Sequence, residues 1–330
     1  MLKLRSLMVA MVVCTASACW ADGIDWESLP YTSISSYEAV TAAGGSAYTG
    51  GFPVRMIGVV LNNTEDWLNP TANNFFAPYT FQMGGQSELI IQAVATGDFG
   101  GVFCWMGQNY GNTYRADPDY SYSNAEWTAE LGRLGLYGGD GVTNPIRAGT
   151  LVEIRARIGL NYGGKMNVNE AHNNDPANDF EIIILDRNYG LPTATELSLS
   201  DLKHADDTFI FDATRQTGGE RYQASRVELK DVWITSACGW TSDTDITVTD
   251  GLRTFNVYLG LNSSFNGTEL FAAGEHFNVT GILDQASSNG MGGYQLLAMN
   301  ASDFAPVPEP ATLTLLAIGG LAVIRKRRTA

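Results

Sequence analysis

Residues 273 to 282, Ala-Gly-Glu-His-Phe-Asn-Val-Thr-Gly-Ile, decide the fold class of this chain. After the Ala-Gly turn signal, apolar Phe277 and Val279 alternate with polar neighbours. A period of two is typical of a strand that buries one face and leaves the other in water. The stretch therefore predicts a β-strand that follows a tight turn, and with its counterparts elsewhere it indicates an all-β protein.

The same landmarks occur twice along the chain, which indicates an internal repeat. A Gly-Gly-x-x-Tyr segment starts at Gly44 and again at Gly218, and a second Ala-Gly turn lies at 148–149. A later Gly-Gly pair opens the last strand of each copy, at Gly163 and Gly292. We expect strands at 54–61, 88–95, 101–106, 152–158 and from 165, and again at 227–235, 245–249, 254–259, 277–283 and from 294. The cores should include Val54, Ile57, Val59, Ile154, Ile158, Val227, Leu229, Val232, Val279 and Leu283.

Each copy has five short predicted strands, with the strongest turn signal before the fourth. This arrangement is typical of an OB-fold, a small Greek-key barrel. Residues 273–282 and Gly-Gly-Tyr-Gln-Leu-Leu at 292–297 resemble OB-like modules of secreted bacterial proteins. The resemblance is closer over 220–304 than over 44–187, and it implies two tandem OB-like barrels. A β-sandwich with the same strand count is the alternative.

Two long insertions, Asn62 to Gly85 and Gln108 to Pro145, distinguish the first copy and are rich in aromatic residues. Aromatic faces beside amides and carboxylates suit sugar rings, which stack through their C–H faces. The candidate glycan-binding residues are Trp67, Tyr110, Tyr114 and Trp127. The alternative is that these aromatics plug the end of a barrel. Residues 127–136 have helical spacing of their apolar side chains and would form a short helical lid.

The C-terminal end carries a sorting address. Val307, Pro308, Glu309 and Pro310 precede an apolar run at 311–324. A basic stop follows the run, formed by Arg325, Lys326, Arg327 and Arg328. Basic residues stay on the cytoplasmic side, which places everything before the run outside the inner membrane. The run makes a helix of ~21 Å, shorter than a hydrocarbon core of ~30 Å, so it predicts a marginal transmembrane anchor.

This order of motif, helix and basic end resembles the PEP-CTERM sorting signal of exported bacterial proteins. The resemblance covers about the last 24 residues of the chain. It implies recognition by exosortase, a membrane protease that cuts near the Pro-Glu-Pro segment, and release or renewed anchoring at the surface. An ordinary C-terminal tail anchor is the alternative.

The N-terminal end also indicates export. Lys3 and Arg5 precede an apolar stretch at 7–13, and Ala18 closes an A-x-A signal cleavage site, with Ala21 as an alternative cut. Cleavage after Ala18 would leave a cysteine first, so lipidation stays open as a minor alternative. The expected order is a signal peptide at 1–21, the first OB-like module at 22–190, the second at 191–304, a linker with the motif at 305–310, and the transmembrane helix with its basic tail at 311–330.

The charge of the mature body disfavours nucleic-acid binding. The whole chain has a net charge of −15, and without its two terminal signals it keeps 14 positive and 34 negative side chains, a net charge of −20. Such a field repels phosphate backbones. The acidity also keeps a protein soluble and makes its copies repel one another.

Signals for catalysis and metal binding are weak. His172, His204 and His276 have no partner at triad or zinc spacing. The acidic loops at 173–175 and 243–245 lack the Gly and Glu of an EF-hand, so we interpret them as solvated turns. The chain thus predicts no catalytic residue, no metal site and no cofactor. Whether Cys104 and Cys238 pair stays open.

We therefore expect an inner-membrane-anchored precursor that becomes a non-catalytic structural or adhesive protein of the cell surface or exopolysaccharide matrix. The expected partners are an exosortase-type membrane protease, the inner membrane and polysaccharide, with no nucleic acid. A carbohydrate-binding module protein is the alternative, and a secreted hydrolase or nuclease accessory protein is a third hypothesis.

Overall fold

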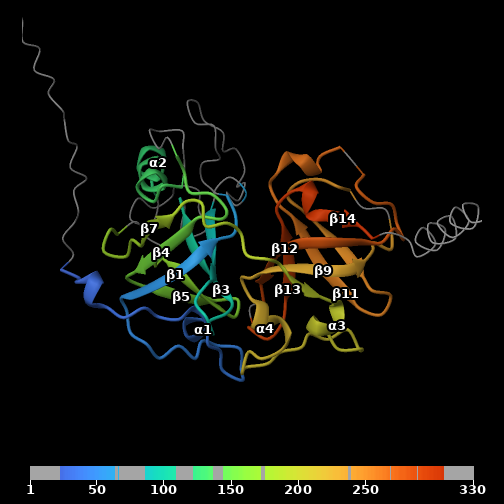
Figure 1. Ribbon diagram of the computed structural model, residues 1–330, viewed down its shortest axis with the longest axis horizontal. Helices are drawn as coiled ribbons and strands as arrows, with labels where there is room; N and C mark the ends of the chain where they lie inside the picture. Colours follow the sequence, from blue (N-terminus) through green and yellow to red (C-terminus); the bar gives the residue numbers. More distant parts are fainter. Residues whose placement is uncertain are drawn as a thin grey trace, which may run out of the picture.

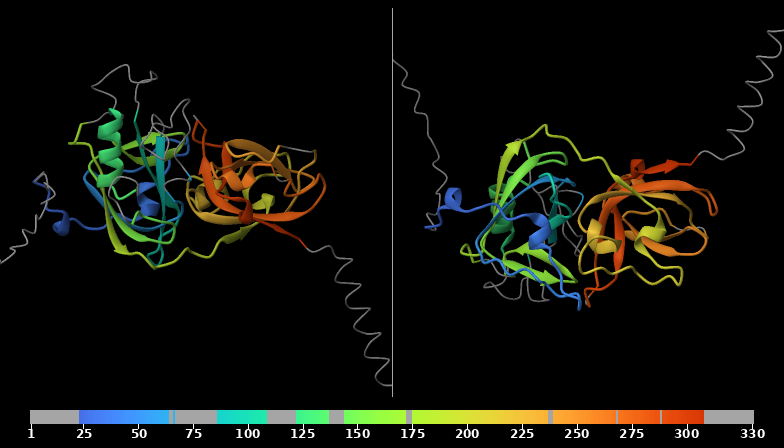
Figure 2. Two further views of the ribbon diagram at one scale, coloured as in Figure 1. Left: turned by 90° about the horizontal axis from the view of Figure 1, so that it is seen from above. Right: turned by 60° about the horizontal axis from the view of Figure 1, so that its bottom comes forward.

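The protein is mostly β, with few and short helices, in a computed structural model. The structure describes residues 23–63, 66, 86–108, 122–136, 144–171, 175–236, 239–267, 269–287 and 289–307. Two seven-stranded sheets follow each other along the chain and stand side by side (Figures 1 and 2). We call the body around the sheet of 54–186 the first module and that around the sheet of 195–306 the second module. The all-β prediction is confirmed at this level.

The first sheet has the strand order β5-β6-β3-β2-β1-β4-β7, and its neighbours are antiparallel except for β3 and β6. Only Arg157 and Ile158 separate β4 from β5, so one bent stretch pairs first with β1 and then with β6. The strands are β1 (Val54–Val60), β2 (Gln86–Ala93), β3 (Gly101–Gly107), β4 (Leu151–Ala156), β5 (Gly159–Tyr162), β6 (Lys165–Asn169) and β7 (Glu181–Asp186).

The second sheet has the order β10-β11-β13-β12-β9-β8, and β14 pairs with β12. β11 and β13 are parallel, as are β8 and β9. A turn at Asp250-Gly251 joins β10 to β11, and Gly251 adopts the positive φ of +89° that favours glycine. The strands are β8 (Thr195–Leu197), β9 (Arg226–Val232), β10 (Thr244–Thr249), β11 (Thr254–Leu259), β12 (Phe277–Gln285), β13 (Tyr294–Ala298) and β14 (Phe304–Pro306).

Within the described residues, neither ladder closes on itself into a complete barrel. The first ladder ends at β5 and β7, and the second at β10 and β8. Two reciprocal backbone hydrogen bonds between Trp233 and Thr249, 3.0 and 2.8 Å long, link the end of β9 to β10 outside the ladder. The fold shown is therefore two large sheets, each wrapped around its own apolar core.

The longest described helix is α2 (Asn124–Arg133), which confirms the helix predicted from Trp127. It starts earlier than predicted because Ser123 and Glu126 form a capping box at its N-terminus. The shorter helices are η1 (Trp26–Ser28), α1 (Ile34–Tyr37), α3 (Leu199–Leu202), α4 (Gly218–Tyr222), η3 (Ser263–Phe265) and η4 (Ala301–Asp303).

No helix in the described part of the chain is long and apolar enough to cross a membrane. The predicted transmembrane run at 311–324 lies outside the described residues, and so do Ala18, Ala21, Pro308 to Pro310 and the basic stop.

The predicted core residues are buried, with two corrections. Ile57 is only half-buried because it lies on the face of β1 opposite Val54 and Met56, which point into the first core. Val59 shares that outer face and is fully buried because the second module covers it. Ile158 is half-buried because it lies at the bend between β4 and β5.

Candidate functional site

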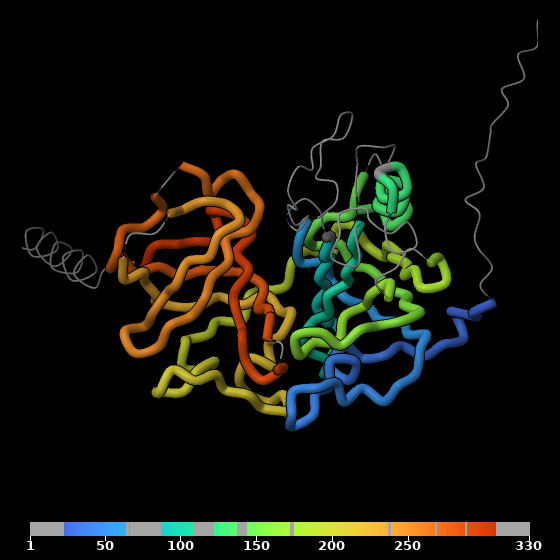
Figure 3. The backbone as a smooth tube through the Cα atoms, turned by 180° about the vertical axis from the view of Figure 1, so that it is seen from behind, coloured from blue at the N-terminus to red at the C-terminus, as the bar shows by residue number. Residues whose placement is uncertain are grey.

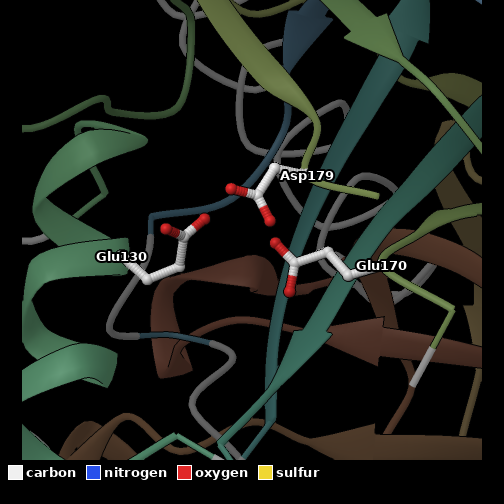
Figure 4. A group of neighbouring side chains, drawn as sticks. All are labelled: Glu130, Glu170 and Asp179. Carbon is white, nitrogen blue, oxygen red and sulfur yellow. The ribbon is translucent and has the colours of Figure 1, made fainter. Parts of the chain in front are cut away.

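Three carboxylates meet beside α2 (Figure 4). Glu130 comes from α2, Glu170 follows β6, and Asp179 precedes β7. One oxygen of each lies within 4.8 Å of the others. Glu130 and Glu170 are buried and Asp179 is partly buried, so this acidic cluster is a charged site inside a mostly apolar module.

The local sequence explains how Glu130 reaches this place. The Glu126 amide donates to Ser123 Oγ at 3.3 Å, and the Ser123 amide donates to Glu126 Oε2 at 2.7 Å, so the first turn of α2 is fixed. Trp127 and Leu131 then form its buried face. Glu130 lies three residues after Trp127, next to that face, where its carboxylate meets Glu170, which follows β6, and Asp179, which precedes β7.

Arg133 is the main cation of the acidic cluster; Arg157 also acts on Asp179 but is paired with Glu181. Arg133 Nε donates to the two oxygens of Glu130 at 3.0 and 2.8 Å, and its guanidinium lies 3.7 Å from Asp179. Arg133 Nη1 also donates to the carbonyl of Phe180 at 2.9 Å. The Tyr122 hydroxyl donates to Glu170 Oε2 at 3.1 Å. Three ionised carboxylates would therefore exceed the available positive charge.

Burial and the excess of negative charge raise the pKa values of two acids in the cluster. Burial, and then Glu130, raises the pKa of Glu170 well above the ordinary carboxyl value. Burial, and then Glu130, raises the pKa of Asp179 to about 6. Both effects are expected when like charges share a site of low polarity. Both shifts favour the protonated acids, and Glu170 lies beside the Glu130–Arg133 ion pair.

The cluster could supply oxygen ligands to a hard cation such as Ca²⁺. Arg133, however, already binds both oxygens of Glu130, and its fixed positive charge opposes a metal ion at the same place. The donor set therefore fits a proton-sharing ion cluster better than a metal site. Sequence reasoning missed this cluster because the three acids have no characteristic spacing and meet only through the fold.

The candidate glycan-binding residues need one correction. Trp127 is fully buried, and its ring lies 5.8 Å from that of Tyr122 inside the first core, so it has no face free for a sugar. The helical spacing that predicted α2 also places Trp127 on the core side. Trp67, Tyr110 and Tyr114 lie outside the described residues.

His276 has a partner that sequence spacing did not reveal. Its Nδ1 lies 2.6 Å from Asp231 Oδ1, and its ring stacks on Trp233 at 4.4 Å. Pairing of β9 with β12, with an irregular register at Phe277, brings these residues together across 45 positions. The pair orients an imidazole, which is one part of a catalytic triad but not a triad.

The remaining sequence candidates have structural contacts. In the acidic loop at 243–245, Asp243 accepts a hydrogen bond from Tyr258 at 2.6 Å and Asp245 accepts one from Asn256 at 3.0 Å. Cys104 is buried and has no disulfide partner among the described residues, and burial raises its pKa. Cys238 and His172 lie outside the described residues.

The end of the second module fixes where the C-terminal tail begins. β14 pairs with β12, and the Val307 amide then donates to the carbonyl of His276 at 3.0 Å. From this point, residues 306–328 match the family model of the PEP-CTERM protein-sorting motif. The chain carries a PEP-CTERM sorting motif. The prediction made from Val307 onward is confirmed, and the motif implies an exported protein that exosortase, a membrane protein, processes on the way to the cell surface.

A comparison with curated proteins gave no match to this chain. Among solved structures, the chain is similar to one described as "Structure and Conformational Change of a Replication Protein A Heterotrimer Bound to ssDNA". The match has 9% identity and covers 91% of this chain and 72% of that chain, with a TM-score of 0.21. A likeness at this TM-score carries no argument about fold or function.

Proposed function

We propose that this chain is a PEP-CTERM protein whose mature body is a non-catalytic structural component of the cell surface or the exopolysaccharide matrix. The observation that carries the proposal is the sorting motif directly after β14 of a folded, all-β body. A protein that is addressed to the surface as a stable, strongly acidic body needs no further chemistry to act there as a building element.

We infer further that each module is an OB-like barrel. In the first module β1, β2 and β3 form an antiparallel meander, and in the second module β10 and β11 form a hairpin that, within the described residues, reaches β9 only through the Trp233–Thr249 bridge. In both modules the last strand runs parallel to an earlier one: β6 to β3, and β13 to β11. The bent stretch of β4 and β5 pairs with the first strand at one end and with the last strand at the other, as β12 does with β9 and β13. The Trp233–Thr249 link supports closure of the second module. One sheet around each core favours a barrel over a sandwich.

The charge of the body supports a role among many copies rather than on nucleic acid. A net charge of −20 on the mature chain repels phosphate and keeps neighbouring copies apart in solution. Weak contacts to matrix polymers, about millimolar each, can still hold such a protein in place when many copies act together. Trp127 does not support the carbohydrate-binding alternative, because its side chain is buried in the core.

Two measurements test the proposal. Mass spectrometry of protein extracted from the cell surface should show a C-terminus close to Pro308–Pro310, and a Glu309→Ala variant should accumulate uncut in the membrane fraction. A deletion strain should lose matrix cohesion, and the His276→Ala body should restore it as well as the wild type does. Surface material that still ends at Ala330 contradicts the sorting. Turnover of a glycan or ester that is abolished by His276→Ala contradicts the non-catalytic role.

A further inference from the structure

The two modules meet through a buried polar contact, which we call the seam. It contains Glu38, which follows α1, and four residues of the second module: Arg215, Glu220, Gln223 and Gln285. Their exposed fractions lie between 0 and 3%. A third apolar cluster adjoins the seam and contains Val59, Leu61, Ile90, Phe103, Ala224, Ile282, Leu297 and Met299. Figure 3 shows the two modules side by side from behind.

Direct contacts make the seam close. The Gly101 amide donates to the Gln223 carbonyl at 2.9 Å. A Cβ on Gly101 would lie 2.1 Å from the Ala224 carbonyl oxygen, and one on Gly290 would lie 2.0 Å from that of Gly44. Backbones of the two modules therefore touch at places where only glycine fits. The seam is not a loose surface between two independent bodies.

Two cations lie between the modules: Lys165 forms an ion pair with a carboxylate, whereas Arg215 hydrogen-bonds to backbone carbonyls. Lys165 forms a buried ion pair with Asp284, and its ammonium lies 3.7 Å from the centre of the Phe103 ring. Arg215 donates to the Ser35 carbonyl at 2.9 Å and to the Glu220 carbonyl at 2.9 Å, both of which are backbone groups. Arg215 is therefore the main cation beside the two buried acids Glu38 and Glu220, and Lys165 has a smaller effect on Glu38.

In each of the two acids, one carboxyl oxygen accepts a hydrogen bond. Glu38 Oε2 accepts from the Met166 amide at 2.9 Å, and Glu220 Oε1 accepts from the Tyr294 hydroxyl at 2.5 Å. The other oxygen of each acid has no hydrogen-bond partner among the described residues, and neither has Arg215 Nη2. Gln285 also lies beside Glu220, and its amide lowers the pKa of that carboxyl. A buried carboxylate without its full set of partners is costly, so a proton on one acid stabilises the closed seam.

Several other charged and titratable groups surround these acids and cations. The charged and titratable neighbours of Glu38 are Arg215, Lys165, Glu220, Tyr37 and Cys104. Glu220 lies near Arg215 and Tyr294, and Arg215 also lies near Asp98 and Arg221. Lys165 lies near Asp284 and Glu88. Burial raises the pKa of Glu38 to about 8, although Arg215 opposes the rise. Burial also raises the pKa of Glu220.

We propose that the seam is a pH-dependent contact, in which a protonated Glu38 holds the two modules together as one body and its ionisation loosens them. Separation would return Glu38 to water, where a carboxyl group ionises near its ordinary pKa of 4.5. The closed seam therefore binds the proton more tightly than the open one. Its stabilising contribution is fully present below about pH 4.5 and is lost as the pH rises to about 8.

Scanning calorimetry and small-angle scattering of the mature, surface-extracted protein test the inference. At about pH 5 we expect one unfolding transition for both modules, and at about pH 9 two transitions with a larger radius of gyration. Glu38→Gln keeps the Met166 hydrogen bond without a charge, so this variant should unfold in one transition at both pH values. Glu170→Gln is the matched control, because it removes a buried acid of the first module that lies away from the seam.

Hydrogen exchange gives a second measurement that does not need a variant. The Gly101 and Arg226 amides donate across the seam, the latter to Gln92 Oε1 at 2.9 Å, and their protection should fall between about pH 5 and 8 after correction for intrinsic rates. A wild type with the same single transition and unchanged protection over this range overturns the proposal. So does a Glu38→Gln variant that separates at the wild-type pH. Failure here leaves the sorting and structural role untouched, because neither depends on the seam.

Discussion

At the scale of single residues, the N-terminal segment depends on one buried ion pair. Arg55 binds Glu153 through two contacts of 2.8 and 3.2 Å, and both side chains are at most 5% exposed. Tyr31 donates to the same carboxylate at 2.8 Å, and Arg55 donates to the Trp26 carbonyl at 2.7 Å. The pair therefore joins β1 and β4 to the chain that precedes them.

We expect Glu153→Gln to destabilise the protein by about 3 kcal/mol, because it removes the buried counter-ion of Arg55 and leaves only the exposed Glu27, 3.3 Å away. Denaturant unfolding measures the loss. Glu196→Gln is the control, since Glu196 is exposed and lies 3.5 Å from Lys230 in a surface pair worth at most about 1 kcal/mol. Equal losses for the two variants would show that the buried pair has no special role.

The acidic cluster predicts a pH dependence of the opposite sign to that of an ordinary salt bridge. The pKa of Asp179 is raised to about 6, so its contribution to stability is fully present below about pH 4 and is lost as the pH rises through 6. Asp179→Asn should flatten the stability curve over this window in urea titrations.

Asp212 provides the matched control for that experiment. Hydrogen bonds, the first of them from the Thr214 hydroxyl, lower its pKa to about 2, so its contribution is present above about pH 4 and is lost as the pH falls through 2. Asp212→Asn should leave the window between pH 4 and 6 unchanged. A wild-type curve without slope in that window would contradict the raised pKa of Asp179.

At the scale of elements, β14 sets the distance between the folded body and the sorting motif. It pairs with β12, and Phe304 packs against Trp240 and Phe277. Only residues 308–310 separate the anchored Val307 from the apolar run, a reach of about 10 Å at ~3.3 Å per residue. A protease that binds an extended segment must therefore work close to the second module.

We expect an insertion of about six Gly and Ser residues after Val307 to speed tail removal, because it lengthens the extended segment beyond the folded body. Pulse-chase labelling in cells with active exosortase measures the rate. The same insertion in the loop at 189–190, away from the tail, is the control. An unchanged rate in the first variant would mean that the body does not limit access.

Local patterns predicted several elements well and missed others. The strand at 254–259 and the Asp-Gly turn before it follow from period and turn chemistry, and α2 follows from helical spacing. β5, β7, β8 and β14 were not predicted, because the place of each depends on the strand beside it: β5, β7 and β8 end their ladders, and β14 pairs with the start of β12. The predicted closed barrels remain an inference, since closure depends on links such as Trp233–Thr249 that no local pattern contains.

At the scale of the whole molecule, the seam makes two modules into one body. Ile57 and Val59 share one face of β1, yet only Val59 is covered by the second module. A charge at Val59 would be buried against Ile90 and Leu297, whereas a charge at Ile57 would reach water.

We therefore expect Val59→Asp to split thermal unfolding into two transitions at every pH, because it adds an unpaired charge to the apolar cluster that adjoins the seam. Ile57→Asp should keep a single transition near neutral pH. Scanning calorimetry at matched concentration distinguishes the two. One transition for both variants would mean that the modules are held together by other contacts.

The sequence by itself determined the features that short segments specify: strand and helix periods, the turns at paired glycines, and a sorting address that is recognised as a linear motif. Only the tertiary structure decided which face of each strand is covered. It also brings His276 to Asp231, brings Glu130, Glu170 and Asp179 together, and buries Glu38 in the seam. The physical reason is range. Period and turn chemistry act between neighbours in the chain, whereas burial and charge balance depend on residues that only the pairing of distant strands brings together.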